Sequence, residues 1–136
     1  MSEPPRVIVN ADDFGLHPAI NEGIEHGHRD GMITSASLMT LGPALDDAVR
    51  RARSLPALDL GLHFTLVGVP GLPSGLGAFF AAYLRGQLPA RVITDALYRQ
   101  LDLALRTHKL LLSHIDSHQH LHAFPPLMRV VCRVAA

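Results

Sequence analysis

Two short segments of the sequence are dense in side chains that can bind metal or move protons. Asp12 and Asp13 are adjacent in VIVNADDFG, directly after an apolar run, and HIDSHQHLH at 114–122 holds four histidines and one aspartate. Neighbouring carboxylates repel each other, so such a pair usually implies a bound cation or a shared proton. Together the two segments predict a metal-dependent hydrolytic site. The alternative for Asp13 is that it merely caps the helix that follows.

A catalytic metal site typically has three protein ligands and leaves positions open for water and substrate. We expect these ligands to be Asp13, His63 in GLHFTL and His118, one carboxylate and two imidazoles from separate parts of the chain. The alternative for a solitary histidine such as His63 is a hydrogen-bonded core residue.

The histidine-rich segment offers further candidates. His118, His120 and His122 alternate along the chain, so an extended backbone would point all three to one face. Only one or two of them need touch the metal, and the others would orient ligands or meet substrate. We expect Asp116, and Ser37 earlier in the chain, to support ligands or contact substrate. The histidines at 17, 26, 28 and 108 are expected to be solvated.

Short apolar segments alternate with segments of helical period, which predicts an α/β fold with parallel strands linked by crossover helices. In such a fold, loops that follow the strands converge at one edge of the sheet, where ligands bind. Four clusters of polar side chains lie at the ends of the predicted strands and would meet at that edge. They are Asp12 with Asp13, residues 34–37, His63, and residues 116–122. The predicted strands are 6–10, 33–39, 59–66 and 110–117, and the predicted helices are 18–30, 43–54, 90–108 and one from Pro125 to the end.

The segment 67–89 interrupts this alternation with glycines, prolines and two phenylalanines. We expect a long loop containing a short helix, Gly77–Arg85, that lies over the site end of the fold. A plain surface excursion is the alternative.

Composition excludes several classes of protein. The 136 residues include 12 basic and 12 acidic side chains and are 48% hydrophobic, which predicts one globular domain or less without a surface for nucleic acid. Cys132 is the only cysteine, so a reducing compartment is expected. No segment has the features of a signal peptide or the roughly 20 apolar residues of a membrane span. We therefore expect a cytoplasmic protein without a transmembrane segment.

In the segments that contain the candidate aspartates and histidines, the chain strongly resembles the YdjC-like carbohydrate deacetylases. This family includes chitooligosaccharide deacetylases and proteins associated with hopanoid biosynthesis. The resemblance implies a deformed (β/α) barrel, one divalent metal ion, Mg²⁺ or Zn²⁺, and removal of acetyl from an N-acetylated amino sugar. By position it assigns Asp13, His63 and His118 to the metal and Asp12 to the catalytic base. His120 or His122 would then protonate the departing amine. The matching segments are VNADDFGLHPAINEGI, GMITSASLM, GLHFTL and HIDSHQHLHAFP.

The chain departs from the family pattern in two respects. It has Gln119 where many members have histidine, and it stops near the middle of the family's usual extent, before a His-Pro-Gly motif. A complete (β/α) barrel needs roughly 250 residues. Residues 1–136 are thus expected to form a single incomplete barrel domain, about half of a TIM-like barrel with the C-terminal half absent, and homo-oligomerisation is a possible consequence.

Two other functions remain open at this point. One is an amidohydrolase-type metal hydrolase, which uses H-x-H ligands such as His118 and His120. The other is a truncated, inactive fragment that binds metal or sugar. Among acetylated substrates, the segment LGAFFAAYLRG suggests a hopanoid-linked amino sugar.

Overall fold

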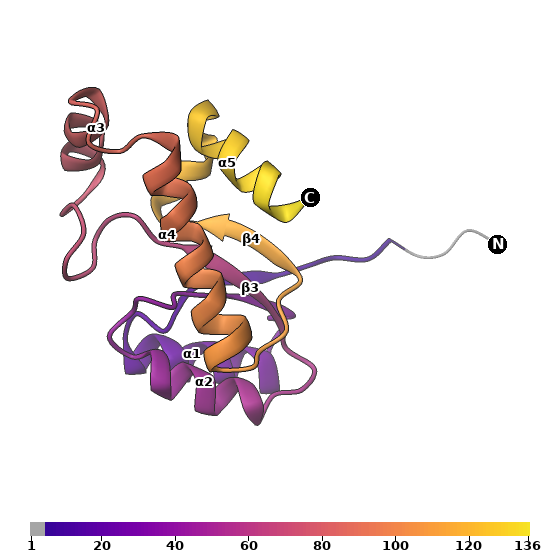
Figure 1. The fold of residues 1–136 in the computed structure, drawn as a ribbon. Helices are drawn as coiled ribbons and strands as arrows, with labels where there is room; N and C mark the ends of the chain where they lie inside the picture. Colours follow the sequence, from indigo (N-terminus) through magenta and orange to yellow (C-terminus); the bar gives the residue numbers. More distant parts are fainter. Residues whose placement is uncertain (1–4) are drawn as a thin grey trace.

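A parallel four-stranded sheet forms the centre of the protein, as the sequence predicts. The computed structural model describes residues 5–136. The strands follow the chain in spatial order, so each crossover places a strand beside its predecessor (Figure 1). The α/β class with parallel pairing is confirmed. The strands are β1 Asn10–Phe14, β2 Ser35–Leu38, β3 Asp59–Phe64 and β4 His114–Ser117.

Helices connect the strands and close the chain. Their bounds are α1 Pro18–Arg29, α2 Leu45–Arg53, α3 Leu76–Leu84, α4 Ala90–Asp102 and α5 Pro125–Ala135. A π-helical turn, η1 Leu103–Thr107, extends α4, and a 3₁₀ turn, η2 His118–Ala123, separates β4 from α5. The short helix predicted in the 67–89 segment is α3. Among residues 5–136, no helix is both long and apolar enough to cross a membrane.

The first and last strands differ from the predicted ranges. Residues 6–9 lie outside the sheet, and β1 begins at Asn10 and contains both aspartates. Val7 and Ile8 are 75% and 77% exposed, so the apolar run that suggested a buried strand is not buried. Residues 110–113 also precede β4 rather than belong to it, and Leu111 is 90% exposed. Apolar composition alone placed both strand starts too early.

One face of the sheet carries the hydrophobic core. The core side chains of the strands alternate as a pleated strand requires, and they divide into two clusters beneath different helices. The first cluster packs Phe14, Ala36 and Leu38 against α1 and α2. The second packs Leu62 and Phe64 against α4 and α5.

The opposite face of the sheet is polar. It carries the alternate residues of each strand, which by register bring side chains from all four strands together. This face contains four aspartates and two histidines but no lysine or arginine. Its members are Asn10, Asp12, Asp13, Ser35, Ser37, Asp59, Gly61, His63, His114 and Asp116.

Candidate metal centre

A β-bulge brings Asp12 and Asp13 to the polar face together. In the register of β1 with β2, Ala11 pairs with Ala36 and Phe14 with Leu38, so the two aspartates occupy the space of one residue. Asp13 has a φ of +64°, the left-handed region that aspartate tolerates better than most residues. Consecutive residues of a regular strand would face opposite sides, so the bulge is what lets both carboxylates approach His63.

Asp13, His63 and His118 converge although they lie far apart in the sequence. Oδ1 of Asp13 lies 3.2 Å from Nε2 of His63 and 2.9 Å from Nδ1 of His118, and the two nitrogens are 3.4 Å apart. His63 is buried, and the other two side chains are 31% and 14% exposed. The group therefore has a solvent-accessible side, as a site that admits substrate requires.

The spacing and chemistry of these three donors fit a divalent ion. Donors bound at about 2.1 Å to one ion are separated by about 3.0 Å in octahedral and about 3.4 Å in tetrahedral geometry. The observed separations of 2.9, 3.2 and 3.4 Å span this range. A carboxylate with two imidazoles is also a common ligand set of catalytic metal ions.

Asp116 orients His63. Its Oδ1 lies 2.7 Å from Nδ1 of His63, so the ring can donate its Nδ1 proton to the carboxylate and direct Nε2 at Asp13. Burial lowers the pKa of His63, but Asp116 and the charges of Asp12 and Asp13 outweigh it, and the net pKa is raised. Burial likewise raises the pKa of Asp116, but hydrogen bonds from His63 and Ser37 lower it overall. Asp116 is thus held as a carboxylate.

Ser37 links this support to Asp12. The buried hydroxyl donates to Oδ2 of Asp116 at 2.7 Å and accepts from Nδ2 of Asn10 at 2.9 Å. The same amide group of Asn10 donates to Oδ1 of Asp12, also at 2.9 Å. Ser37 therefore connects Asp116, the hydrogen-bond partner of His63, to Asn10, which donates to Asp12.

The sequence reasoning missed Asn10 and His114 as members of this network. His114 Nε2 lies 3.3 Å from Ser37 Oγ, and its Nδ1 lies 2.8 Å from Ser113 Oγ. Because the Ser37 proton goes to Asp116, Nε2 of His114 is the donor to Ser37. The ring lies across Gly61, its partner in β3, where a Cβ would come within 2.2 Å of Nε2. Gly61 of GLH, which pairs with His114 in register, is the one sequence signal that could have indicated this contact.

The expected alternation of His118, His120 and His122 on one face is wrong. Residues 118–123 form a 3₁₀ turn in which Gln119 and His120 have φ values of +53° and +54°. Neither His120 nor His122 belongs to a carboxylate–histidine group that could hold a metal among the described residues. The H-x-H ligand pair of an amidohydrolase-type site is therefore not formed.

His120 and His122 follow His118 in the 3₁₀ turn and have different surroundings. His120 is exposed, and its ring packs edge to face with that of His122 at a centroid distance of 6.0 Å. Ser117 Oγ accepts from the backbone N–H of His122 at 2.7 Å and lies 2.9 Å from its Nδ1. When the hydroxyl donates to Nδ1, the neutral ring carries its proton on Nε2.

The structure also settles two alternatives for single residues. The N-cap of α1 is His17, whose Nδ1 accepts from Ala19 N at 3.1 Å, so Asp13 is not the cap. His28 is half-buried and donates Nδ1–H to the carbonyl of Ile33 at 2.8 Å, so it is not simply solvated. His17 and His26 are exposed, as expected.

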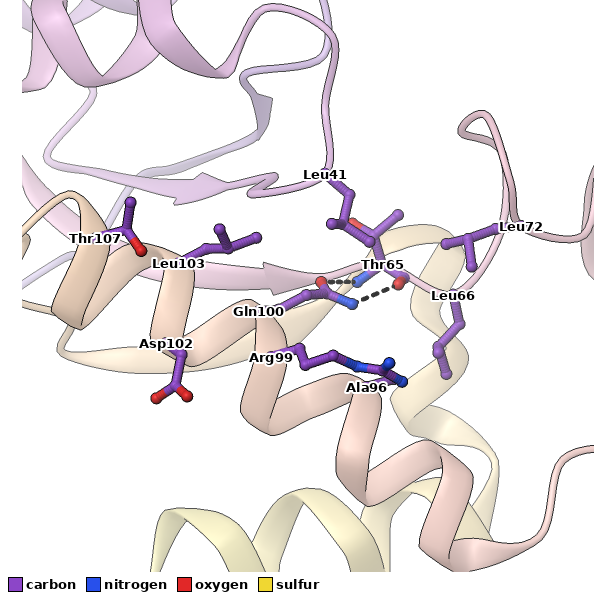
Figure 2. A pocket seen from close by; sticks show the side chains of 10 residues that line it. All are labelled: Leu41, Thr65, Leu66, Leu72, Ala96, Arg99, Gln100, Asp102, Leu103 and Thr107. Carbon is purple, nitrogen blue, oxygen red and sulfur yellow. Dashed lines mark hydrogen bonds between the residues drawn. The ribbon is translucent and has the colours of Figure 1, made fainter.

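A cavity of about 520 Å³ lies away from this centre, between α4 and the end of β3 (Figure 2). Its lining is mostly apolar and includes Leu66, Leu72 and Leu103. The buried Gln100 amide accepts from Thr65 N at 2.9 Å and donates to Thr65 O at 2.8 Å, as Figure 2 shows. These bonds fix the backbone two residues after His63, but the cavity contains none of the candidate ligands.

The chain is similar to several bacterial deacetylases. A carbohydrate deacetylase from Oceanobacillus iheyensis is 35% identical to this chain. The alignment covers 96% of this chain and 60% of that protein. A carbohydrate deacetylase from Brevibacillus brevis is 36% identical, and a chitooligosaccharide deacetylase from Salmonella paratyphi B is 37% identical. In both, 96% of this chain aligns with 55% of the relative. The chain thus spans little more than half the length of these relatives.

The fold and sequence also match a solved structure and a family model. A crystal structure from Enterococcus faecalis V583, described as a candidate cellobiose-phosphate cleavage protein, is 28% identical with a TM-score of 0.77. The match covers 94% of this chain and 54% of that protein. Residues 6–136 match the model of the YdjC-like proteins. This match covers almost the whole chain and includes every residue of the candidate metal centre, and the chain therefore belongs to the YdjC-like protein family.

Proposed function

We propose that the chain carries the metal centre of a hydrolase that removes acetyl from an N-acetylated amino sugar. The observation that carries the proposal is the convergence of Asp13, His63 and His118 with donor separations that suit one divalent ion. The names of the deacetylase relatives support the reaction class. We propose Asp12 as the general base and the other three residues as metal ligands.

The residue types suit amide hydrolysis. When bound, the divalent ion would polarise the acetamide carbonyl and acidify a water molecule. Asp12, whose carboxylate lies within 4.8 Å of ligand atoms of His63 and Asp116, would accept the proton of that water. Asn10 orients the Asp12 carboxylate, while Asp116 and Ser37 hold His63 with Nε2 directed toward Asp13.

Amide cleavage also needs a proton for the departing amine. We propose His122 or His120 as the donor, acting as an imidazolium that becomes neutral when it gives up its proton. Ser117 favours His122, because its hydroxyl can accept Nδ1–H of that imidazolium and leaves Nε2–H free for the amine. The ion is Zn²⁺ or Mg²⁺. Two imidazoles with one carboxylate suit Zn²⁺ better by ligand softness.

The substrate is an N-acetylated amino sugar in a glycan or on a hopanoid. The apolar helix α3, with sequence LGAFFAAYL, supports a hopanoid-linked substrate, while the name of one relative supports a chitooligosaccharide. Both classes present the same acetamide to the metal centre.

A second candidate function is binding of metal or sugar without turnover. It is favoured by one observation, that the chain matches only 55–60% of the length of its deacetylase relatives. The polar face of the sheet, as residues 5–136 form it, would then bind a ligand without turnover.

Acetate release and metal binding, measured on the same preparation, separate the two functions. The chain would be loaded with Zn²⁺ or Mg²⁺ and incubated with N-acetylglucosamine and with chitobiose. Metal-dependent acetate release that Asp12→Asn abolishes supports the deacetylase. One bound ion per chain without acetate release in either metal supports the binding function.

A further inference from the structure

A second pocket contains none of the residues that could hold the metal. Its volume is about 260 Å³, and it lies between α3 and the turn that joins β4 to α5. Figure 1 shows α3 beyond the carboxyl end of the sheet, apart from the other helices. The lining residues are Leu76, Phe80, Gln119, His120, Leu121, Ala123, Phe124 and Pro125.

Two phenylalanine rings form a rigid corner in this pocket. The Phe80 and Phe124 rings are 5.3 Å apart at 86°, and Tyr83 packs on Phe124 at 5.0 Å. Phe79, fully buried, supports Phe80 from behind at 5.4 Å. Phe80 itself is 37% exposed, so its ring is held by the core yet accessible to a ligand.

The backbone directs His120 to this pocket and not to the metal. Gln119 and His120 both adopt positive φ, a conformation that side chains with a Cβ rarely take and that often marks functional sites. The turn holds His118 in the metal centre and, two residues later, leaves the His120 imidazole at the pocket. Two of the residues that line the pocket, Gln119 and His120, therefore directly follow the candidate ligand His118 in the sequence.

We propose that this pocket is a saccharide subsite that binds the sugar ring next to the acetylated one. The proposal rests on the proposed function, because it places the acetamide of the adjoining ring at the metal. The aromatic corner suits the C–H face of a pyranose, whose hydrogens are attracted to the negative face of a phenyl ring. The imidazole of His120 and the amide of Gln119 suit its hydroxyl groups.

The size of the pocket and the part of α3 that lines it favour a sugar ring over a lipid tail. Sites that enclose drug-sized ligands measure roughly 300–1,000 Å³, so a pocket of about 260 Å³ accommodates a single ring. A tail would be expected to use the apolar side of α3 more broadly, including Leu84, which is 84% exposed and does not line the pocket.

Calorimetric titration of the whole chain with chitobiose and with N-acetylglucosamine tests the proposal. We expect the disaccharide to bind roughly three- to tenfold more tightly than the monosaccharide, the range of one aromatic contact. Phe80→Ala should bring this ratio close to one, and Phe80→Tyr should restore it. Leu84→Ala, on the same helix, is the matched control and should keep the wild-type ratio.

Three outcomes would overturn the subsite: a wild-type chain without disaccharide preference, a Phe80→Ala chain that keeps it, or equal losses in Leu84→Ala and Phe80→Ala. Octyl glucoside serves as the lipid-like probe, and tighter binding of it than of chitobiose would identify a tail site. Acetate release is measured separately. Deacetylation without the preference would contradict the subsite alone, and the preference without deacetylation would contradict the proposed function alone.

Discussion

Asp12 and Asp13 both reach His63, although they are consecutive residues of one strand. Each places a carboxylate oxygen within 4.8 Å of a ring nitrogen of His63, because the bulge in β1 sets both residues against a single position of β2. Two carboxylates around one buried imidazole repel each other. A cation between Asp13 and His63 would relieve that repulsion and leave Asp12 free to accept a proton.

His63→Ala should abolish stoichiometric metal binding. The substitution removes Nε2, which completes the three-donor set, and leaves a carboxylate and one imidazole that bind far more weakly. Equilibrium dialysis followed by elemental analysis would measure the bound ion. His26→Ala, which removes an exposed imidazole of α1, is the control and should bind like wild type. One equivalent bound by His63→Ala would refute this ligand assignment.

Asp12→Asn should keep the metal and lose the reaction. The amide preserves the shape of the side chain but cannot take a proton, so acetate release should fall by roughly two to four orders of magnitude. Bound metal, measured in the same samples, should stay near one ion per chain. Near-normal turnover in this variant would place the base elsewhere.

Ser37→Ala should weaken metal binding, although Ser37 is not one of the proposed metal ligands. Asp116 would lose the hydrogen bond that holds it against His63, and we expect the metal affinity to fall about tenfold. Ser35 offers a matched control two residues earlier on the same face, because it is buried and its hydroxyl has no hydrogen-bond partner. If Ser35→Ala and Ser37→Ala lose affinity equally, the effect comes from packing and not from the network.

Alternation of apolar and helical segments was sufficient to predict the parallel sheet and the order of its elements. It could not place the start of β1, because Val7 and Ile8 are as apolar as core residues yet lie exposed. It also could not predict the bulge at Asp13. A bulge depends on the pairing of two strands, and a single sequence does not state that pairing.

The site was predictable to a similar extent. Asp13, His63 and His118 are distinctive in residue type, and the structure brings them together as expected. The positions of His120 and His122 do not follow from the sequence, because the regular alternation of an extended strand ends where the backbone turns at Gln119. Asn10 cannot be recognised from the sequence, because an amide carries no charge or metal preference that distinguishes it.

The stability of the chain should fall in acid through Asp47. A hydrogen bond from Asn21 lowers the pKa of Asp47 most, burial opposes this, and Arg51 lowers the pKa further. A carboxyl group whose pKa is lower in the folded than in the unfolded state stabilises the fold at pH values above its ordinary pKa of 3.8. This stabilisation is lost as the pH falls through the folded-state pKa.

Urea unfolding at a series of pH values would measure this effect. Asp47→Asn should unfold more easily at pH 7 and show a smaller loss of stability below pH 3.8 than wild type. Asp46→Asn, exposed on the same helix, is the control and should follow the wild-type pH dependence. Equal slopes for wild type and Asp47→Asn would show that other carboxyls dominate acid unfolding.

The chain should self-associate through the edges of its sheet. Within residues 5–136, β1 and β4 each pair with a single neighbour, so backbone groups at both edges have no partner strand. Face-to-face pairing of two polar faces is disfavoured, because it would bring four aspartates of each copy together without lysine or arginine. Edge pairing beside the exposed Ile8 is the more favourable contact.

Size-exclusion chromatography with light scattering, and acetate release measured on the same fractions, would test this association. We expect concentration-dependent oligomers and little turnover in the monomer, since residues 5–136 form one four-stranded sheet without a second sheet opposite its polar face. Ile8→Lys should reduce association by placing a charge beside β1, whereas Leu84→Lys, exposed on α3, should not. A stable wild-type monomer with full deacetylase turnover would show that the four strands suffice for both folding and catalysis.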